Sequence, residues 1–340
     1  MKKRLAALAL LVLLPAGCGE REDPEPAARG IERIALVLDF FPNADHAGLY
    51  AAIGTGAFKD AGLEVELQTP SDPAAPLRLL AAGRADLAIS YEPEVLLARD
   101  RGLKVVAIGA VVQKPLTSLM SLGDKAIKDP AQLQGKKVGT AGIPYQSAYL
   151  KAILDEAGVD PADVEEINVG FNLGPAMISK RVDATLGAFW NYEGVELQRA
   201  KRKPTILRVE DLGVPTYNEL VVVAREEDAR DRGPMLRRFM LALGRGHEAL
   251  REDARTGVDP LLAANKDLER DLQEAVVKAT LPVFFPEDDE RAFGYMEEGE
   301  WATYGRWMAD NDLLKRREDP RRALTNEFVP GEGPQAAEGP

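Results

Sequence analysis

The sequence predicts an α/β fold in two lobes, each with a largely parallel sheet flanked by helices, followed by a helical C-terminal segment. Apolar runs typical of buried strands alternate with short helices in the first part of the chain. The same alternation resumes after about residue 129 and forms a second unit. From Arg230 onward the apolar spacing is almost wholly helical.

The first unit begins with a continuous apolar run, Ile34–Asp39, as expected of a strand buried on both faces. A helix is expected from Ala47 to about Ala61, because Gly62 ends it before a strand at Leu63–Gln68. The remaining elements expected here are a helix at Pro76–Ala82, a strand at Asp86–Ser90, a helix at Glu92–Asp100 and a strand at Lys104–Val112.

The second unit repeats this order. Its expected strands are Lys137–Gly139, Glu165–Val169, Ala184–Leu186, Thr205–Val209 and Leu220–Ala224. One expected helix begins at Asp129, and a second follows the loop GIPYQ. Two more cover Pro175–Ser179 and Val195–Arg199. The C-terminal helices are expected at Met235–Ala254, Pro260–Lys266, Asp267–Thr280 and Asp288–Asn311.

The N-terminal residues have the order of a secretory signal peptide. Three positive charges precede an apolar run, Leu5–Leu14, which is too short for a permanent membrane span. Cys18, the only cysteine, follows small residues, and this order resembles a bacterial lipobox. The resemblance implies a signal peptide over 1–17 and lipid attachment to Cys18. The alternative is an ordinary signal peptide with an incidental cysteine, because Pro15 stands where the motif prefers leucine.

Charge excludes some classes of partner. The chain has 43 Lys and Arg against 55 Asp and Glu, a net charge of −12, which argues against nucleic acid or an anionic membrane face as a partner.

Residues 18–30 are acidic and lack apolar periodicity, so we expect a disordered tether there, and we expect a disordered tail over 326–340.

Four motifs occur in an order that resembles a known family: LDFFPNADHAGLYAAIGTGAFKDAGLEVEL, LAAGRADLAISYEPEVLLAR, LQGKKVGTAGIPYQSAYLKAIL and VDATLGAFWNYEGVEL. The chain resembles the solute-binding proteins of ABC importers in the thiamine-pyrimidine-precursor, or formylaminopyrimidine-binding-like, group. The resemblance implies a type II periplasmic binding protein fold. It places lobe I at 31–114 and 220–325 and lobe II at 115–219, with a ligand between them and the importer's permease subunits as partners.

Aromatic and polar residues gather where four of the expected strands end, which is where open α/β sheets bind ligands. These residues suit a flat, nitrogen-rich heteroaromatic ligand such as a 4-aminopyrimidine. The aromatic side chains stack on the faces of such a ring, and a few polar groups form hydrogen bonds with its edge. The candidate ligand-binding residues are Phe41, Asn43, His46, Tyr91, Glu92, Tyr145, Trp190, Tyr192 and Glu193. A carboxylate such as Glu193 accepts a hydrogen bond from the ligand's amine.

Each candidate also has a structural interpretation. Phe40 and Phe41 cannot both face the cleft if the strand pleat continues, and the resemblance favours Phe41. Asn43 is typical of a turn, His46 of a helix start, and the tyrosines and Trp190 of lobe packing.

Other functions remain open at this point. Riboflavin also requires flat aromatic walls, whereas nitrate or sulfonate would require cationic groups that these motifs supply sparingly. The rival class is an enzyme, because a yeast branch of the same fold makes the thiamine pyrimidine with a cysteine-rich iron motif. That motif is absent from this sequence, which also lacks a glycine-rich nucleotide loop and an HExxH site, so no catalysis, cofactor or metal is expected.

Overall fold

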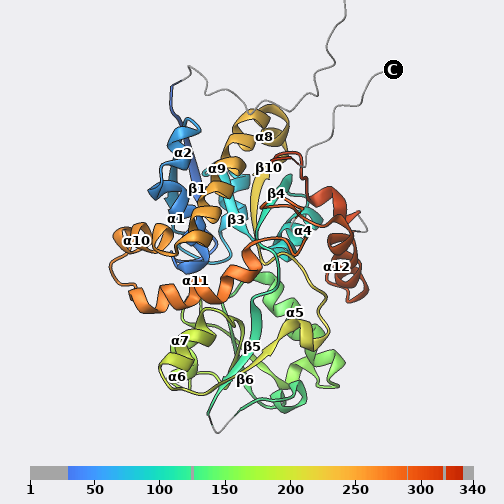
Figure 1. Ribbon diagram of the computed structural model, residues 1–340. Helices are drawn as coiled ribbons and strands as arrows, with labels where there is room; N and C mark the ends of the chain where they lie inside the picture. The colour runs from blue at the N-terminus through green and yellow to red at the C-terminus, as the bar shows by residue number, and fades with distance from the viewer. Residues whose placement is uncertain (1–29, 124–125, 289, 317–318, 332–340) are drawn as a thin grey trace, which may run out of the picture.

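The computed structural model describes residues 30–123, 126–288, 290–316 and 319–331. These residues form two lobes, each centred on a five-stranded sheet, with the chain passing twice between them (Figure 1). The expected signal peptide, Cys18 and nearly all of the expected tether lie outside the described residues. Among the described helices, none is long and apolar enough to cross a bilayer.

The first sheet has the strand order β2-β1-β3-β10-β4. Its strands are β1 (Glu32–Val37), β2 (Leu63–Gln68), β3 (Leu87–Ser90), β4 (Val105–Val112) and β10 (Leu220–Arg225). β1 pairs in parallel with β2 and β3, whereas β10 is antiparallel to β3 and β4. Strands β3 and β4 are buried throughout because helices cover both faces of the sheet.

The second sheet has the equivalent order, β7-β6-β8-β5-β9. Its strands are β5 (Thr117–Leu122), β6 (Lys137–Thr140), β7 (Glu165–Asn168), β8 (Ala184–Phe189) and β9 (Pro204–Arg208). Its one antiparallel strand is β5. In both sheets the antiparallel strand is the first strand after the chain has crossed from the other lobe. The expected fold class, two α/β lobes with mostly parallel sheets, is therefore confirmed.

Helices cover the sheets and continue to the C-terminal region. The α-helices are α1 (Ala47–Gly54), α2 (Ala57–Asp60), α3 (Pro76–Ala81), α4 (Glu92–Asp100), α5 (Pro144–Glu156), α6 (Leu173–Ile178), α7 (Glu193–Arg199), α8 (Glu226–Asp231), α9 (Gly233–Glu252), α10 (Arg255–Ala264), α11 (Arg270–Phe284) and α12 (Glu298–Asp310). In Figure 1, α1, α2, α9 and α10 lie on one side of the first sheet and α4 and α12 on the other, while α11 runs along the junction between the lobes. Short 3-10 helices are η1 (Ala44–His46), η3 (Pro130–Leu133), η4 (Pro161–Asp163), η5 (Val209–Leu212) and η6 (Pro320–Ala323).

The structure corrects several expected elements. The single helix expected from Ala47 to Ala61 is two helices, because Gly56 adopts a left-handed conformation between them. The helix expected at Asp288–Asn311 begins only at Glu298. Strand β5 was not expected, because its sequence, TSLMSL, mixes polar and apolar residues without regular alternation, although five of its six residues are buried.

The C-terminal region gives a further correction. The disordered tail was expected from residue 326, yet residues 326–331 are placed against lobe I. Phe328 and Val329 are buried, and the Asn326 side chain exchanges hydrogen bonds with the backbone of Met296. Two apolar side chains in the core offset the entropy of ordering this short segment.

Close helix packing fixes the position of α1 and hence of the residues before it. A Cβ atom at Gly48 would lie 2.1 Å from the ring of His247 in α9, so only glycine fits there. His247 is buried, donates from Nδ1 to the carbonyl of Leu243 and stacks on Phe293. The histidine of α9 therefore packs in the core, and the glycine of the HAGLY sequence permits this packing.

Two segments join the lobes, between β4 and β5 and between β9 and β10. Glu219, just before β10, is fully buried and accepts the backbone N–H groups of Leu116 and Thr117 on the other segment, at 2.6 and 2.8 Å. It also accepts from the hydroxyls of Thr117 and Tyr217. One carboxyl group thus ties both connections together. The strands of each sheet fall within the segments expected for that lobe, while the limits of the lobes stay a prediction.

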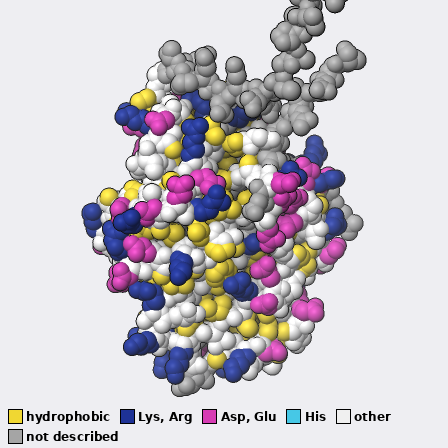
Figure 2. Space-filling view, viewed as in Figure 1, with side chains coloured by type: hydrophobic (Ala, Val, Ile, Leu, Met, Phe, Trp, Pro, Cys, Tyr) yellow, Lys and Arg dark blue, Asp and Glu magenta, His cyan; other side chains and the backbone are white. Residues whose placement is uncertain are grey.

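Both charge signs are spread over the face shown in Figure 2, with acidic side chains gathered toward its right edge. Apolar side chains lie in a band across the middle of this face.

Candidate functional site

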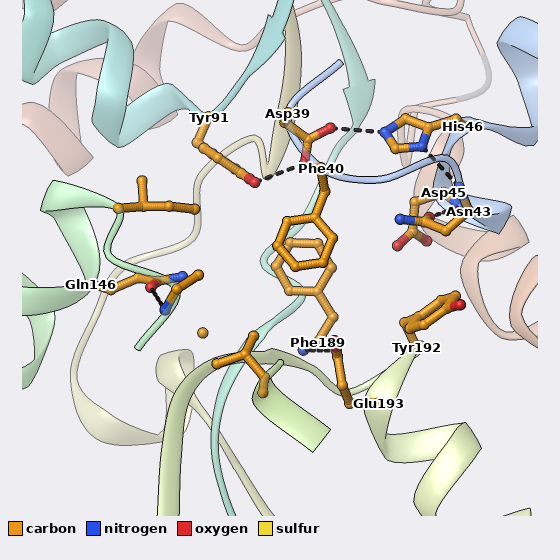
Figure 3. Close-up of a pocket in the computed structure, with 14 residues that line it drawn as sticks. Asp39, Phe40, Asn43, Asp45, His46, Tyr91, Gln146, Phe189, Tyr192 and Glu193 are labelled. Carbon is orange, nitrogen blue, oxygen red and sulfur yellow. Dashed lines mark hydrogen bonds and ion pairs between the residues drawn. The ribbon is translucent and has the colours of Figure 1, made fainter. Parts of the chain in front are cut away.

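A cavity lies between the two sheets, beyond the ends of β1, β3, β6 and β8 (Figure 3). It encloses about 430 Å³ of space between atoms, its mouth included. The residues that line it from lobe I are Asp39, Phe40, Asn43, Asp45, His46 and Tyr91. Those that line it from lobe II are Ala141, Ile143, Gln146, Leu173, Gly187, Phe189, Tyr192 and Glu193.

Two phenylalanine rings approach this cavity from opposite lobes. Phe40 follows β1, and Phe189 is the last residue of β8. In Figure 3 both rings lie near the centre of the view, Phe40 reaching down from lobe I and Phe189 up from lobe II. The Phe40 ring also meets Phe171 of lobe II edge-on, with 4.7 Å between the ring centroids.

A buried hydrogen-bonded group forms the lobe I wall. Asp39 Oδ1 lies 2.8 Å from Nε2 of His46, and Asp39 Oδ2 accepts from the hydroxyl of Tyr91 at 2.7 Å. The backbone N–H of Asn43 donates to Nδ1 of His46, so Nδ1 is an acceptor and the ring proton is on Nε2, which donates to Asp39. Burial and the Asp39 charge raise the pKa of Tyr91 well above its usual value, so its hydroxyl stays a donor. Both ring nitrogens of His46 are thus used within the protein.

Asn43 begins the 3-10 helix η1 that carries these residues. Its side-chain oxygen accepts from the N–H of Asp45 at 2.8 Å, and its amide nitrogen donates to the carbonyl of Phe41 at 3.0 Å. This is the usual chemistry of a helix N-cap. Asn43 lines the cavity and also has the turn role that its sequence context indicated.

Glu193 forms the opposite wall at the first turn of α7. Its side chain is 8% exposed, and Oε2 accepts the backbone N–H of Phe189 at 2.8 Å. Burial raises the pKa of Glu193 to about 8, since the acid is removed from water without a cationic partner. The neighbouring Tyr192 accepts a hydrogen bond from Gln273 of α11 at 3.4 Å.

Asp45 is a second buried acid of the cavity. It is 2% exposed and its pKa is raised to about 6, chiefly by burial and partly opposed by the hydrogen bond from Asn191. Asn191 precedes α7 in lobe II, so this hydrogen bond, 2.6 Å long, joins the two lobes.

Of the predicted ligand-binding residues, the structure brings five to the cavity: Asn43, His46, Tyr91, Tyr192 and Glu193. It places Phe41, Glu92, Tyr145 and Trp190 outside the lining. Phe40 takes the place expected for Phe41, whose ring lies beside that of Phe40, with 4.7 Å between the centroids, and packs against Tyr192 and Phe171.

The other three residues have structural partners. Glu92 is fully buried and accepts the backbone N–H of Asn218. Tyr145 packs on Tyr91. Trp190 donates from Nε1 to the carbonyl of Pro115 and has the guanidinium of Arg208 4.1 Å from its ring. Contact of any of the nine predicted residues with a ligand remains a prediction.

Five polar or aromatic lining residues were absent from the predicted set: Asp39, Phe40, Asp45, Gln146 and Phe189. All five fall inside the four motifs on which the family resemblance rests. An acidic residue that closes an apolar strand, such as Asp39, is a signal that was available. The contact of Asp45 with Asn191 spans 146 positions, and nothing local in the sequence indicates it.

Comparison with known proteins identifies the family. A family model described as NMT1/THI5 like matches residues 43–256. The formylaminopyrimidine-binding protein of Halalkalibacterium halodurans is 32% identical over 315 residues, which are 92% of this chain and 95% of that protein. The chain belongs to the NMT1/THI5-like family. The resemblance inferred from the four motifs is therefore confirmed.

Members of the NMT1/THI5-like family differ in their described activity. A relative from Legionella pneumophila, 23% identical over 88% of this chain and 92% of that protein, is named a 4-amino-5-hydroxymethyl-2-methylpyrimidine phosphate synthase. Among solved structures, the alkanesulfonate-binding protein of Xanthomonas axonopodis pv. citri aligns with a TM-score of 0.67 at 16% identity, over 88% of this chain and 99% of that one. The expected periplasmic binding protein fold is thereby confirmed.

Proposed function

We propose that this protein is the solute-binding component of an ABC importer and captures an aminopyrimidine precursor of thiamine between its lobes. The observation that carries the proposal is the pair of phenylalanine rings from opposite lobes, Phe40 and Phe189, beside the buried acid Glu193. The two rings can stack on the faces of a flat heterocycle, and the acid can form hydrogen bonds with the edge of that heterocycle. The similarity to a formylaminopyrimidine-binding protein over nearly the whole chain supports the same ligand class.

The raised pKa of Glu193 fits a 4-aminopyrimidine edge. At neutral pH the buried acid holds a proton, because its pKa is about 8. An aminopyrimidine offers a ring nitrogen beside an exocyclic N–H donor, so the acid and the ring share one proton across one hydrogen bond. The other carboxyl oxygen accepts from the amine. The pair gains two hydrogen bonds without leaving an isolated charge in the cavity.

The aromatic walls of the cavity suit more than one flat ligand. A riboflavin importer component remains the second candidate within the binding class, because its flat ring suits the same aromatic walls.

Binding rather than catalysis is the activity we propose. The family includes synthases, and the enzyme alternative rests on that relationship. The cysteine-rich motif expected of the synthase branch is absent from the sequence, where Cys18 is the only cysteine. His46 and Tyr91 both donate to the carboxyl group of Asp39, and this arrangement supports the wall of a binding site.

Closure of the lobes links capture to transport. In the structure, contacts such as Phe40 to Phe171 and Asp45 to Asn191 join the lobes beside the cavity. We propose that the ligand stabilises this closed form and that the importer's permease subunits recognise it, because a ligand shifts a conformational equilibrium only through differential affinity.

Exchange of Glu193 for glutamine tests the proposed contact. The amide keeps an oxygen for the amine and an N–H for the ring nitrogen, but it cannot transfer a proton to that nitrogen. The charge-assisted form of the pair is lost, so affinity for formylaminopyrimidine should fall by about 1–3 kcal/mol in calorimetric titration. Glu196→Gln is a matched control, since Glu196 lies one turn further along α7, outside the cavity lining. Equal affinity of wild type and Glu193→Gln would remove Glu193 from the site.

We also propose that the protein is held on the extracytoplasmic face of the cell membrane by a lipid on Cys18. The support is the lipobox-like order of residues before this cysteine. In the native host, a Cys18→Ala variant should lose labelling by a radioactive fatty acid that the wild type takes up. Equal labelling of the two proteins contradicts the anchor.

A further inference from the structure

Asp45 occupies a junction between the lobes at the wall of the cavity. Its Oδ1 accepts from Nδ2 of Asn191 at 2.6 Å, and the hydroxyl of Thr280 in α11 lies 3.3 Å from the same oxygen. Asn191 Nδ2 is also 2.6 Å from the Thr280 hydroxyl. All three residues are almost fully buried. Asn191 of lobe II therefore contacts lobe I at two atoms here, the Thr280 hydroxyl and one oxygen of the Asp45 carboxyl group.

The other oxygen of Asp45 has no such partner. Oδ2 is buried and, within the part of the chain that the structure describes, receives no hydrogen bond. Figure 3 shows the Asp45 carboxyl group at the cavity wall, turned toward the space between the labelled residues. A buried acceptor without a donor costs free energy, so the closed arrangement is incomplete at this atom.

Nearby donors on the same wall are already engaged. The Nε2 proton of His46 and the hydroxyl of Tyr91 both go to Asp39, and the backbone N–H of Asp45 goes to Asn43. The side-chain oxygen of Asn191 is a second buried acceptor without a partner among the described residues, so it adds no donor. None of these neighbouring groups therefore supplies a hydrogen bond to Oδ2 of Asp45.

We propose that Asp45 couples ligand recognition to lobe closure: Oδ1 holds lobe II through Asn191, and Oδ2 accepts from a second donor on the ligand, carried by its side arm. This inference rests on the proposed aminopyrimidine function, in which Glu193 takes the ring edge. Asp45 becomes a positioning and specificity-determining residue, which favours ligands with an O–H or N–H on the side arm over those with a plain methyl group.

The coupling follows from the geometry. Asn191, which contacts Asp45, belongs to lobe II, whereas Thr280 belongs to α11 of lobe I, so separation of the lobes would remove the Asn191 part of the cover over Asp45. A donor on Oδ2 therefore lowers the free energy of the closed form more than that of an open form, in which water satisfies the same oxygen. Ligands that lack the donor close the lobes with an unpartnered oxygen and bind more weakly.

The test compares two ligands on the full-length protein by calorimetric titration. 4-Amino-5-hydroxymethyl-2-methylpyrimidine carries the side-arm donor, and 4-amino-2,5-dimethylpyrimidine has the same ring and amine without it. The wild type should prefer the hydroxymethyl compound about tenfold or more, the scale of a hydrogen bond to a charged group. Asp45→Asn, which places an amide N–H near the same position, should bring the ratio of the two affinities close to one.

Asn191→Ala is the matched variant that tests the contact of Asp45 Oδ1 with lobe II. It removes the lobe contact but leaves Oδ2, so both affinities should fall by the same factor and their ratio should stay as in the wild type. A ratio that Asp45→Asn leaves unchanged, or that Asn191→Ala abolishes, overturns the inference while the proposed function stands. Wild type that binds neither compound overturns the proposed function itself.

A crystal structure of wild type with the hydroxymethyl compound provides a test that needs no variant. The inference predicts the side-arm oxygen within about 3.2 Å of Asp45 Oδ2. A water molecule on Oδ2, with the side arm directed elsewhere, overturns it.

Discussion

Replacement of Glu219 by alanine should lower the free energy of unfolding by about 3–5 kcal/mol, because it leaves several buried donors without an acceptor, each at a cost of roughly 1–3 kcal/mol. These donors are the backbone N–H groups of Leu116 and Thr117 and the hydroxyl of Tyr217. The site is fully buried, so water cannot replace the carboxyl group without a rearrangement of the junction between the lobes. Urea unfolding followed by circular dichroism measures the change.

Glu219→Gln is the control for this prediction. The amide retains one oxygen for the two backbone N–H groups, so the loss should be clearly smaller than for alanine. A loss below about 1 kcal/mol for Glu219→Ala would mean that the two connections are held by other contacts. Because Glu219 lies on one connection and its backbone partners Leu116 and Thr117 lie at the end of the other, the same variant should also loosen the junction between the lobes.

The ligand-free protein should become less stable as pH rises from about 5.5 to 8.5. Burial raises the pKa of several carboxyl groups, well above the usual value for Glu92 and to about 6 for Asp45, 7 for Glu94, 7 for Glu219 and 8 for Glu193. An unfolded chain loses these protons near pH 4, whereas the folded chain keeps them to higher pH. Between about pH 4 and the pKa values of the folded state, the folded chain binds more protons than the unfolded chain. The free energy of unfolding therefore falls as pH rises through the folded pKa values.

The expected size of this effect is a fall of more than about 5 °C in the melting temperature between pH 5.5 and pH 8.5, measured by scanning calorimetry at constant ionic strength. Glu219→Gln removes one titrating group, so its melting temperature should fall less steeply between pH 6 and pH 8 than that of wild type. A melting temperature that stays level or rises over this range contradicts the burial of these acids in the ligand-free state.

Local sequence patterns were sufficient for most of the fold. The helix Glu92–Asp100 was predicted to the residue, because Pro93 is favourable in its first turn and Gly102, with a left-handed backbone, follows its end. Strand β5 was missed because its burial comes from the sheet around it. Disorder was wrongly predicted for residues 326–331 because Phe328 and Val329 pack against residues that are distant in the sequence. Tertiary contacts decided both cases.

The candidate site, like the fold, was predicted where local sequence was sufficient and missed where tertiary contacts decide. Its location at four strand ends follows from the fold class, and the ends of β1, β3, β6 and β8 do meet at the cavity. The choice between Phe40 and Phe41 depends on the rotation of the chain after β1, which the sequence does not specify. The role of His46, whose two ring nitrogens bind Asp39 and Asn43, and the raised pKa of Glu193 both depend on burial that only the packed lobes produce.

The most direct test of the central claim is a thermal-shift panel on the purified protein. It should include hydroxymethyl- and formylaminomethyl-aminopyrimidines, thiamine, riboflavin, nitrate and taurine. A ligand at about a hundred times its dissociation constant adds roughly 2.7 kcal/mol of stability, which is readily seen as a higher melting temperature. We predict a rise with the aminopyrimidines and none with nitrate or taurine. A rise with riboflavin alone, or no rise with either aminopyrimidine, would contradict the account.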